Sequence, residues 1–349
     1  MIKKLTYLLF ALYFFTSCEE IYHPAINKVN GHLIVDALVT NDLPQNYVHL
    51  SKSSAFYDTN PPAAVTGASV KLLDSKGNAI QGIESSPGFF NFKKIPEVGQ
   101  NYKLQISLNG DSYESETVTM PSIPSIDKFY SERVEKEEFI TDATGAPVPT
   151  TVVSRALYLD APITAACSHY RFATRAVMEW VYVVPNTPMA PTIYGWQSLY
   201  SNNVYNIAGQ KKFSQNDKIE KQQLMLLPYN TMGMVQTGAS VKGWIFILNQ
   251  YGTSSESFDY HEKLNNQLTA DGNLLDPVQT QVFGNITCKT DSSKIVFGYF
   301  DLNSTRQYRY FISFSDMKPN DKLVTRELTN YPEISNDGKT VNLRPEWWE

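Results

Sequence analysis

The sequence predicts a mainly β protein with one clear helix. Aromatic residues make up 13% of the chain, and its 21 Tyr and 18 Phe are residue types that strands accommodate well. Short apolar runs, several of them alternating with polar residues, are separated by turn residues. One stretch, which begins near Ser255 and ends before the turn Asp271–Asn273, carries its apolar residues at helical spacing instead.

The first residues are typical of a bacterial lipoprotein signal peptide. Lys3 and Lys4 precede the apolar run Leu5–Phe15, and two small residues then lead to Cys18. As a helix, this run of about 11 residues spans roughly 16 Å, which is too short for a hydrocarbon core of roughly 30 Å. We expect residues 1–17 to be removed and the Cys18 thiol to be acylated; a plain secretory signal is the alternative.

The residues after Cys18 predict where the anchored protein faces. Glu19 and Glu20 resemble the surface-export signal of lipoproteins in Bacteroidetes-type bacteria. We therefore expect an outer-membrane protein, held by its lipid and facing the cell exterior. Residues 18–30 are interpreted as the tether.

Charge and cysteine content limit the partners and cofactors. The formal net charge is −5 with no basic stripe, so we expect no nucleic-acid partner. Besides Cys18, the chain contains Cys167 and Cys288, which could form one disulfide in an oxidising compartment or remain two buried thiols. His169 lies near Cys167, but one His–Cys pair is not a ligand set, so we expect no metal and no cofactor.

Residues 31–122 are predicted to form a small β-sandwich, immunoglobulin-like or transthyretin-like. The runs with strand composition are His32–Thr40, Tyr47–Ser51, Ala68–Leu73, Phe89–Phe92, Tyr102–Leu108 and Tyr113–Thr119. Asn109-Gly110 is the dipeptide favoured in a two-residue hairpin. Short strands at this spacing, each followed by turn residues, favour a sandwich.

Residues 126–349 are predicted to form a larger β-rich domain that contains the helix. The segment Met120–Ile126, with two prolines, is interpreted as the boundary. Ile126–Arg133 is predicted as a strand, Glu132–Glu138 as a solvated charged face and Asp142–Pro149 as a loop. The later strands are expected at Val152–Leu159, Tyr170–Val184, Lys242–Gln250, Lys294–Phe300 and Arg309–Phe314.

Aromatic residues around the proline-rich segment Pro185–Pro191 are the candidate ligand or partner surface. The residues proposed for this surface are Tyr194, Trp196, Tyr200 and Tyr205. Exposed Tyr and Trp supply contact area for sugars or proteins at low entropic cost. The alternative is that alternate members, with Trp180, fill the core.

Local catalytic motifs are missing from the sequence. It contains no His-Glu-x-x-His helix, no Gly-x-Ser-x-Gly elbow and no phosphate-binding Gly-x-x-x-x-Gly-Lys loop. Glycoside hydrolysis needs only two carboxylates and no local motif, so Glu179 and Asp160 keep a hydrolase open as an alternative. Pairing of such acids with Arg171 or Arg175 is the structural interpretation.

Several motifs together resemble one family of surface lipoproteins. Besides Cys18, they are Val65–Val70, the Met120-Pro121 junction, Phe258–Leu264, Asp276–Gln279, Gly284–Ile286, Val296–Phe300 and Pro345–Trp348. The chain is similar to the domain-of-unknown-function 4249 family of Bacteroidetes-type outer-membrane surface lipoproteins over nearly its whole mature length. Many relatives carry a cysteine-rich stretch near the end that this chain lacks.

The resemblance implies a role in uptake or surface assembly, because such proteins are commonly encoded beside TonB-dependent outer-membrane receptors. We expect a non-catalytic accessory or ligand-capturing subunit that works beside a receptor barrel and takes a glycan or peptide ligand. A secreted hydrolase of glycan or peptide and a structural assembly factor are the alternatives. The family has no established reaction, so no catalytic residue carries over.

Overall fold

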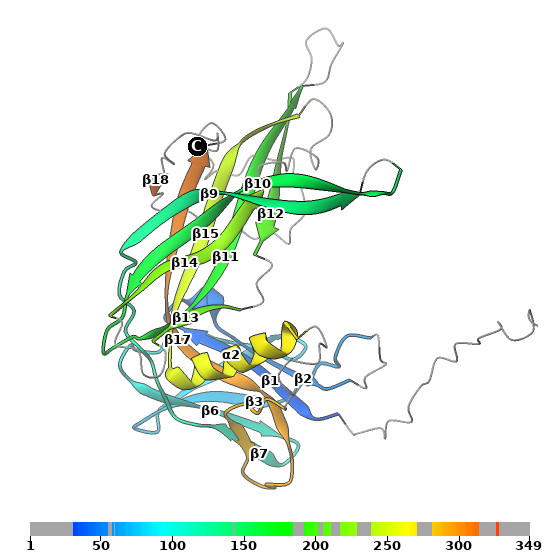
Figure 1. Cartoon of the computed structure of the whole chain (residues 1–349). Coiled ribbons are helices and arrows are strands. Elements are labelled where there is room, and N and C mark those ends of the chain that lie inside the picture. Colours follow the sequence, from blue (N-terminus) through cyan, green and yellow to red (C-terminus); the bar gives the residue numbers. More distant parts are fainter. Residues whose placement is uncertain are drawn as a thin grey trace, which may run out of the picture.

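The fold is mainly β, with two sheets and one α-helix in the part of the chain that the structure describes (Figure 1). This computed structural model describes residues 31–54, 58, 60–141, 144–183, 192–201, 205–210, 217–228, 239–270, 281–313 and 326–327. The helices are η2 (Leu43–Gln45, a 3-10 turn) and α2 (Ser255–Leu268). The strands are β1 (Leu33–Thr40), β2 (Tyr47–Lys52), β3 (Ser69–Asp74), β4 (Ala79–Ser86), β5 (Phe89–Phe92), β6 (Asn101–Leu108), β7 (Asp111–Ser115), β8 (Val118–Thr119), β9 (Lys128–Thr141), β10 (Pro147–Pro162), β11 (His169–Val183), β12 (Thr192–Tyr200), β13 (Asn206–Gly209), β14 (Lys218–Pro228), β15 (Ala239–Thr253), β16 (Ile286–Cys288), β17 (Val296–Ser313) and β18 (Arg326–Glu327).

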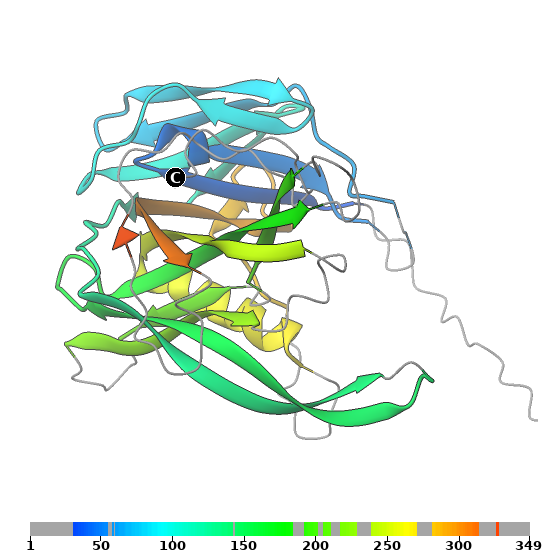
Figure 2. The same cartoon turned by 90° about the horizontal axis from the view of Figure 1, so that it is seen from above.

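The long strand β17 joins the two halves of the larger sheet. The sheet runs in the order β12-β11-β15-β17-β1-β2-β5-β4-β3-β6-β7-β16. The first part of β17 pairs in parallel with β1, from Val296 to Asn303, and the second part pairs antiparallel with β15, from Ser304 to Ser313. The two halves therefore share one continuous strand, visible as the orange ribbon between them in Figure 2.

One face of β17 packs into both main cores. Alternate residues of a strand point to the same face of the sheet. On this face, the first core receives Val296, Phe300 and Leu302, and the second core receives Tyr308, Tyr310 and Ile312. The opposite face carries polar residues, among them Asp301, Gln307 and Arg309.

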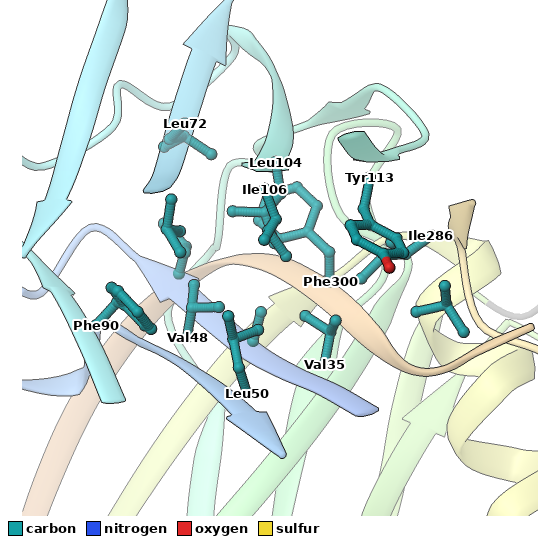
Figure 3. Close-up of a cluster of buried hydrophobic side chains, with 14 of the residues drawn as sticks. Val35, Val48, Leu50, Leu72, Phe90, Leu104, Ile106, Tyr113, Ile286 and Phe300 are labelled. Carbon is teal, nitrogen blue, oxygen red and sulfur yellow. The ribbon is translucent and has the colours of Figure 1, made fainter. Parts of the chain in front are cut away.

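The first core lies inside the sandwich that the sequence predicts over residues 31–122. Figure 3 shows its buried side chains, with Val35, Leu50 and Leu104 among them. Ile286 of β16 and Phe300 of β17 complete this core, and β16 also pairs with β7. Because each such side chain contributes about 1.5–3 kcal/mol on full burial, the sandwich depends on strands from the C-terminal half of the chain.

The family-like segments Gly284–Ile286 and Val296–Phe300 hold this junction together. Gly298 has φ +89°, and a Cβ there would lie 2.0 Å from the carbonyl oxygen of Val35. A Cβ on Gly284 would lie 1.6 Å from the carbonyl oxygen of Gly298. Asn285 bridges the same strand, because its Nδ2 donates to the Phe300 carbonyl (3.0 Å) and its Oδ1 accepts from the Phe300 N–H (2.8 Å). The backbones approach so closely that only glycine fits at both positions.

The second core lies between the β11–β15–β17 part of the large sheet and a three-stranded sheet, β14-β10-β9. The Phe129 ring of β9 stacks on the Tyr310 ring, and the two ring centroids are 4.1 Å apart. β9 and β10 are longer than the sequence suggests, since their ladder continues to the pair Thr141–Pro147. The charged segment Glu132–Glu138, predicted as a solvated face, lies in the two-stranded arm that β9 and β10 form (Figure 2). Cross-strand pairing with β10 satisfies its backbone there.

Helix α2 confirms the predicted helix but begins with a different cap. The Ser254 hydroxyl, one residue before the expected Ser255, accepts the hydrogen bond from the Ser257 N–H at 3.1 Å. His261 of the predicted stripe is buried, whereas Leu268 is 59% exposed. Among the described residues, no helix has both the length and the apolar character needed to cross a membrane.

The two cysteines proposed as a disulfide lie in different cores. Cys167 is a buried free thiol of the second core, and Cys288 is a buried free thiol of the first. The structure therefore has the alternative arrangement, in which each cysteine packs as a small apolar residue. Burial raises the pKa of the Cys167 thiol, which keeps it protonated at neutral pH.

Candidate functional site

A groove of about 590 Å³ lies where the two halves of the large sheet meet. This volume is within the range of small-ligand sites. We call it the central groove; it is lined by Leu38, Asp42, Gln45, Tyr47, Ala173, Thr174, Arg175, Tyr200, Ile247, Asn249, Tyr251, Gln307 and Arg309. Hollows of similar volume occur beside β3–β4 and at the start of α2, but the central groove gathers three tyrosines and two arginines.

Strand register arranges the lining of the groove in rows. Arg175 of β11 is opposite Ile247 of β15, which is opposite Arg309 of β17, and Tyr200 of β12 extends this row on the other side of Arg175. We call these four residues the arginine row. Because neighbouring strands are about 4.8 Å apart, the Cα atoms of the two arginines are separated by roughly 10 Å.

The next row orients its side chains by a chain of hydrogen bonds. Arg309 Nε donates to Gln307 Oε1 at 2.8 Å, and Gln307 Nε2 donates to Asn249 Oδ1 at 2.9 Å. An arginine can only donate, so the Gln307 oxygen must face it, and the Gln307 amide nitrogen must then face the Asn249 oxygen. The Asn249 NH₂ group is consequently the outer end of this chain and can donate to a further acceptor.

Arg175 is partly removed from water. Its Nε donates to the Ser198 hydroxyl at 2.9 Å, and its guanidinium lies 5.7 Å from the centroid of the Tyr200 ring. Burial lowers the pKa of Arg175, although the guanidinium stays charged at any physiological pH. Tyr200 is 51% exposed and forms one edge of the groove.

The opposite end of the groove is acidic and phenolic. The Tyr251 hydroxyl donates to Gln45 Oε1 (2.6 Å), and Gln45 Nε2 donates to Asp42 Oδ2 (2.8 Å). The Tyr47 hydroxyl donates to the Asp36 carboxylate at 3.3 Å. Burial raises the pKa of Asp36, and the Tyr47 hydrogen bond partly offsets this rise.

Beside the groove, α2 covers a buried polar cluster made of Ser257, His261 and Asp301. The Ser257 hydroxyl donates to Asp301 Oδ1, and His261 Nε2 lies 3.4 Å from Asp301 Oδ2. His261 Nδ1 donates to the Ser257 carbonyl at 2.9 Å. Burial lowers the pKa of His261, and the Asp301 charge opposes this shift.

This cluster resembles a catalytic triad only in its residue types. The Ser257 hydroxyl donates directly to the Asp301 carboxylate, whereas a nucleophilic serine donates to the imidazole. All three side chains are buried, and none of them lines the central groove. The arrangement instead ties α2 to β17, with His261 packed in the interior and bonded through its Nδ1.

Arg171 connects the cluster electrostatically with the groove. Its guanidinium lies 4.7 Å from the centroid of the Tyr251 ring. Its Nε is buried, without a hydrogen-bond partner among the described residues. The charge of Arg171 helps to keep the Asp36 carboxylate ionised and disfavours protonation of His261.

The predicted surface residues separate into different environments. Tyr200 lines the central groove. Tyr205 instead packs against His261, with their ring centroids 4.6 Å apart. Trp196 is fully buried with Val177 and Ile245, which is the core-filling alternative. Tyr194 lies in β12, but its side chain is outside the described residues, as are Cys18 and the signal segment.

The carboxylates weighed for hydrolysis also separate. Asp160 Oδ1 accepts hydrogen bonds from the Lys221 N–H (2.8 Å) and the Tyr130 hydroxyl (3.2 Å), and none of these residues lines the groove. Glu179 is buried in β11 and does not line the groove. Among the described residues, no three His, Cys, Asp or Glu side chains gather as they would around a metal ion.

Sequence reasoning missed most of the groove. No site role is proposed from the sequence for five of the lining residues, which are Tyr47, Tyr251, Asn249, Gln307 and Arg309. A signal was present, since Asn249/Tyr251 and Gln307/Arg309 are polar pairs spaced by two residues within long apolar strands. Such pairs mark a polar strand face, but only register shows that the faces adjoin.

The comparisons with known proteins assign a family and no activity. No curated protein and no solved structure matches the chain. The family described as Domain of unknown function (DUF4249) matches residues 19–309. On this match, which covers most of the sequence and nearly all of the described strands, the chain belongs to the DUF4249 family.

Proposed function

We propose that the protein is a lipid-anchored outer-membrane protein that captures a ligand in the central groove at the cell exterior and works beside a TonB-dependent receptor. The observation that carries the capture role is the groove itself, which draws its lining from η2 and six strands. The anchor rests on Cys18 and its preceding residues, and the receptor partner rests on the family resemblance.

The groove has the chemistry of a binding surface. Tyr200 exposes half of its side chain at the edge, where an aromatic ring can pack against a sugar or a peptide group. Arg175 and Asn249 present donors from rigid strands, so little entropy is lost when a ligand contacts them. A ligand therefore meets an apolar floor at Ile247 with polar groups on either side.

Filling the groove tests the capture role. Ala173 is an exposed groove residue of β11, and Ala173→Trp places a large ring in the cavity without changing either core. The matched control, Thr287→Trp, adds the same ring on the exposed side of β16. Binding of the full chain to glycan and peptide libraries should be lost in Ala173→Trp and retained in the control.

Equal binding by wild type and Ala173→Trp would place the ligand elsewhere and overturn the groove as its site. Mass analysis of the bound ligand after incubation separates capture from hydrolysis, because capture returns the ligand intact. A cleaved product that depends on the groove would favour the hydrolase alternative.

Anchoring and receptor association need a separate experiment. Cys18→Ala should release the protein from membranes, whereas Cys167→Ala should leave it attached, since Cys167 is buried in the second core. Purification in gentle detergent should recover the lipidated protein with a receptor barrel. Recovery of the protein alone, under conditions that preserve other lipoprotein–barrel pairs, would contradict the receptor partner while leaving capture standing.

A further inference from the structure

We infer that the ligand of the central groove carries a carboxylate, held at the arginine row by Arg175, Arg309 and the Asn249 amide. The inference rests on the proposed capture function and names the chemical class of its ligand. The shared chemistry is a short acidic oligosaccharide or a short acidic peptide.

Hydrogen-bond polarity is the first support. The chain from Arg309 through Gln307 to Asn249 turns both amide oxygens toward internal donors, so the Asn249 NH₂ group is the part of it that faces a further acceptor. Arg175 adds further donors from β11 on the other side of Ile247. A wall composed of donors selects a ligand rich in acceptor oxygens, and a carboxylate supplies two of them with a full negative charge.

Charge distribution along the groove is the second support. Asp42 is the carboxylate among the described lining residues, and Gln45 ties it to Tyr251. Tyr251 lies four residues along β15 from Ile247, so the acidic end is roughly 13 Å from the arginine row. Among the described lining residues, the arginines thus lie at one end and Asp42 at the other, where the Arg171 guanidinium also lies 4.7 Å from the centroid of the Tyr251 ring. A ligand carboxylate is therefore expected at the arginine row, away from Asp42.

Burial of the arginines is the third support. Arg309 exposes 7% of its surface, and it is a lining residue of the groove. Arg175 is half-buried, and the hydrogen bond from its Nε to the Ser198 hydroxyl orients its guanidinium. Partly desolvated guanidinium groups in fixed positions bind carboxylates more strongly than mobile surface lysines do, because screening by water is weaker and less entropy is lost.

Matched ligand pairs test the inference on the full lipidated chain in detergent. The saccharide pair is trigalacturonic acid and its fully methyl-esterified form, and the peptide pair is triglutamate and triglutamine. Calorimetry at low and high salt should show at least about tenfold tighter binding of one acid than of its neutral partner, weakening with salt. The pair that shows this preference identifies the source of the carboxylate.

Variants locate the effect at the arginine row. Arg175→Gln should weaken binding of the preferred acid about tenfold and abolish the preference over its neutral partner, while Arg175→Lys should retain part of it. Arg306→Gln is the matched control: it removes the same charge from the opposite face of β17, where Arg306 is exposed and bonded to Ser125. Arg309→Lys keeps the charge and checks the second arginine, with thermal unfolding confirming that each variant is folded.

Three results would overturn the carboxylate assignment. They are equal binding of acidic and neutral partners, undiminished acid binding by Arg175→Gln, and an equal loss in Arg306→Gln. If a neutral probe binds and Ala173→Trp abolishes that binding, ligand capture stands and the carboxylate assignment fails. If a library ligand binds the wild type but none of the four probes does at millimolar concentration, the carboxylate assignment also fails. If neither the library nor the probes bind, the capture function and the carboxylate assignment both fail.

Discussion

The two halves of β17 present the same kind of surface and use it differently. In each half, one face enters a hydrophobic core and the opposite face is polar. In the first half, α2 covers Asp301 and joins it to Ser257 and His261. In the second half, Gln307 and Arg309 lie in the lining of the central groove. A polar strand face thus becomes a structural contact under a helix and a candidate binding surface where the groove opens.

The largest expected effect concerns the backbone of the first half. Gly298→Ala should lower the free energy of unfolding by about 4 kcal/mol or more, or prevent folding, because the new Cβ would collide with the Val35 carbonyl. Gly110→Ala separates strain from collision: Gly110 also has a positive φ (+87°), but its surroundings are open. It should cost about 1–2 kcal/mol in urea unfolding. Equal costs at the two positions would contradict close packing at the junction.

A smaller effect is expected from one carboxylate in each half. Asp301→Asn should destabilise the protein by about 2 kcal/mol, because the buried Ser257 hydroxyl loses its charged acceptor. Asp42→Asn, the same change at the groove, should cost at most about 1 kcal/mol. Urea unfolding measures both. A similar loss from the two changes would mean that α2 does not distinguish the two halves of the strand.

The dependence of stability on pH should come from the covered half. Burial lowers the pKa of His261 below its usual 6.5, so the unfolded state binds more protons as the pH falls through that value. Stability present at neutral pH should therefore decrease as the pH falls below about 7, by at most about 1.4 kcal/mol per unit for this group.

His261→Asn should reduce this slope. Burial also lowers the pKa of His169, so the slope should be smaller still in the double variant with His169→Asn. Chemical unfolding at a series of pH values measures the effect. A slope unchanged by His261→Asn would show that the imidazole does not titrate with folding.

The smallest expected effect is that of a reducing agent. Cys288 lies in the core beside the first half of β17 and Cys167 in the core beside the second, so no bridge links them. Dithiothreitol should leave the melting temperature unchanged, and both thiols should react with a thiol reagent only after unfolding. A lower melting temperature after reduction would show that the halves are joined covalently.

Local patterns in the sequence predicted the elements that depend on neighbours along the chain. The hairpin at Asn109-Gly110 is confirmed, since both residues adopt the positive φ that such a turn requires. The helix at Ser255–Leu268 is confirmed by periodicity and a serine cap, although the cap is Ser254. Tyr200 was recognised as a candidate because an aromatic residue beside a loop is visible locally.

The groove could not be predicted in this way because its residues meet through long-range register. Arg175 and Arg309 are separated by more than a hundred residues, and β15 places them in one row. A shift of one residue in either ladder would turn one arginine to the opposite face of the sheet. Trp196 shows the same limit, because its burial depends on contact with β15.

By itself, the sequence determined the β class, the turns, the helix Ser255–Leu268 and the lipoprotein-like start, because each follows from the chemistry of residues close together in the chain. Only the tertiary structure decided that β17 passes through both cores and that its polar face is covered by α2 in one half and lines a groove in the other. The physical reason is that strand pairing joins distant segments, and the register of that pairing selects which side chains share a face.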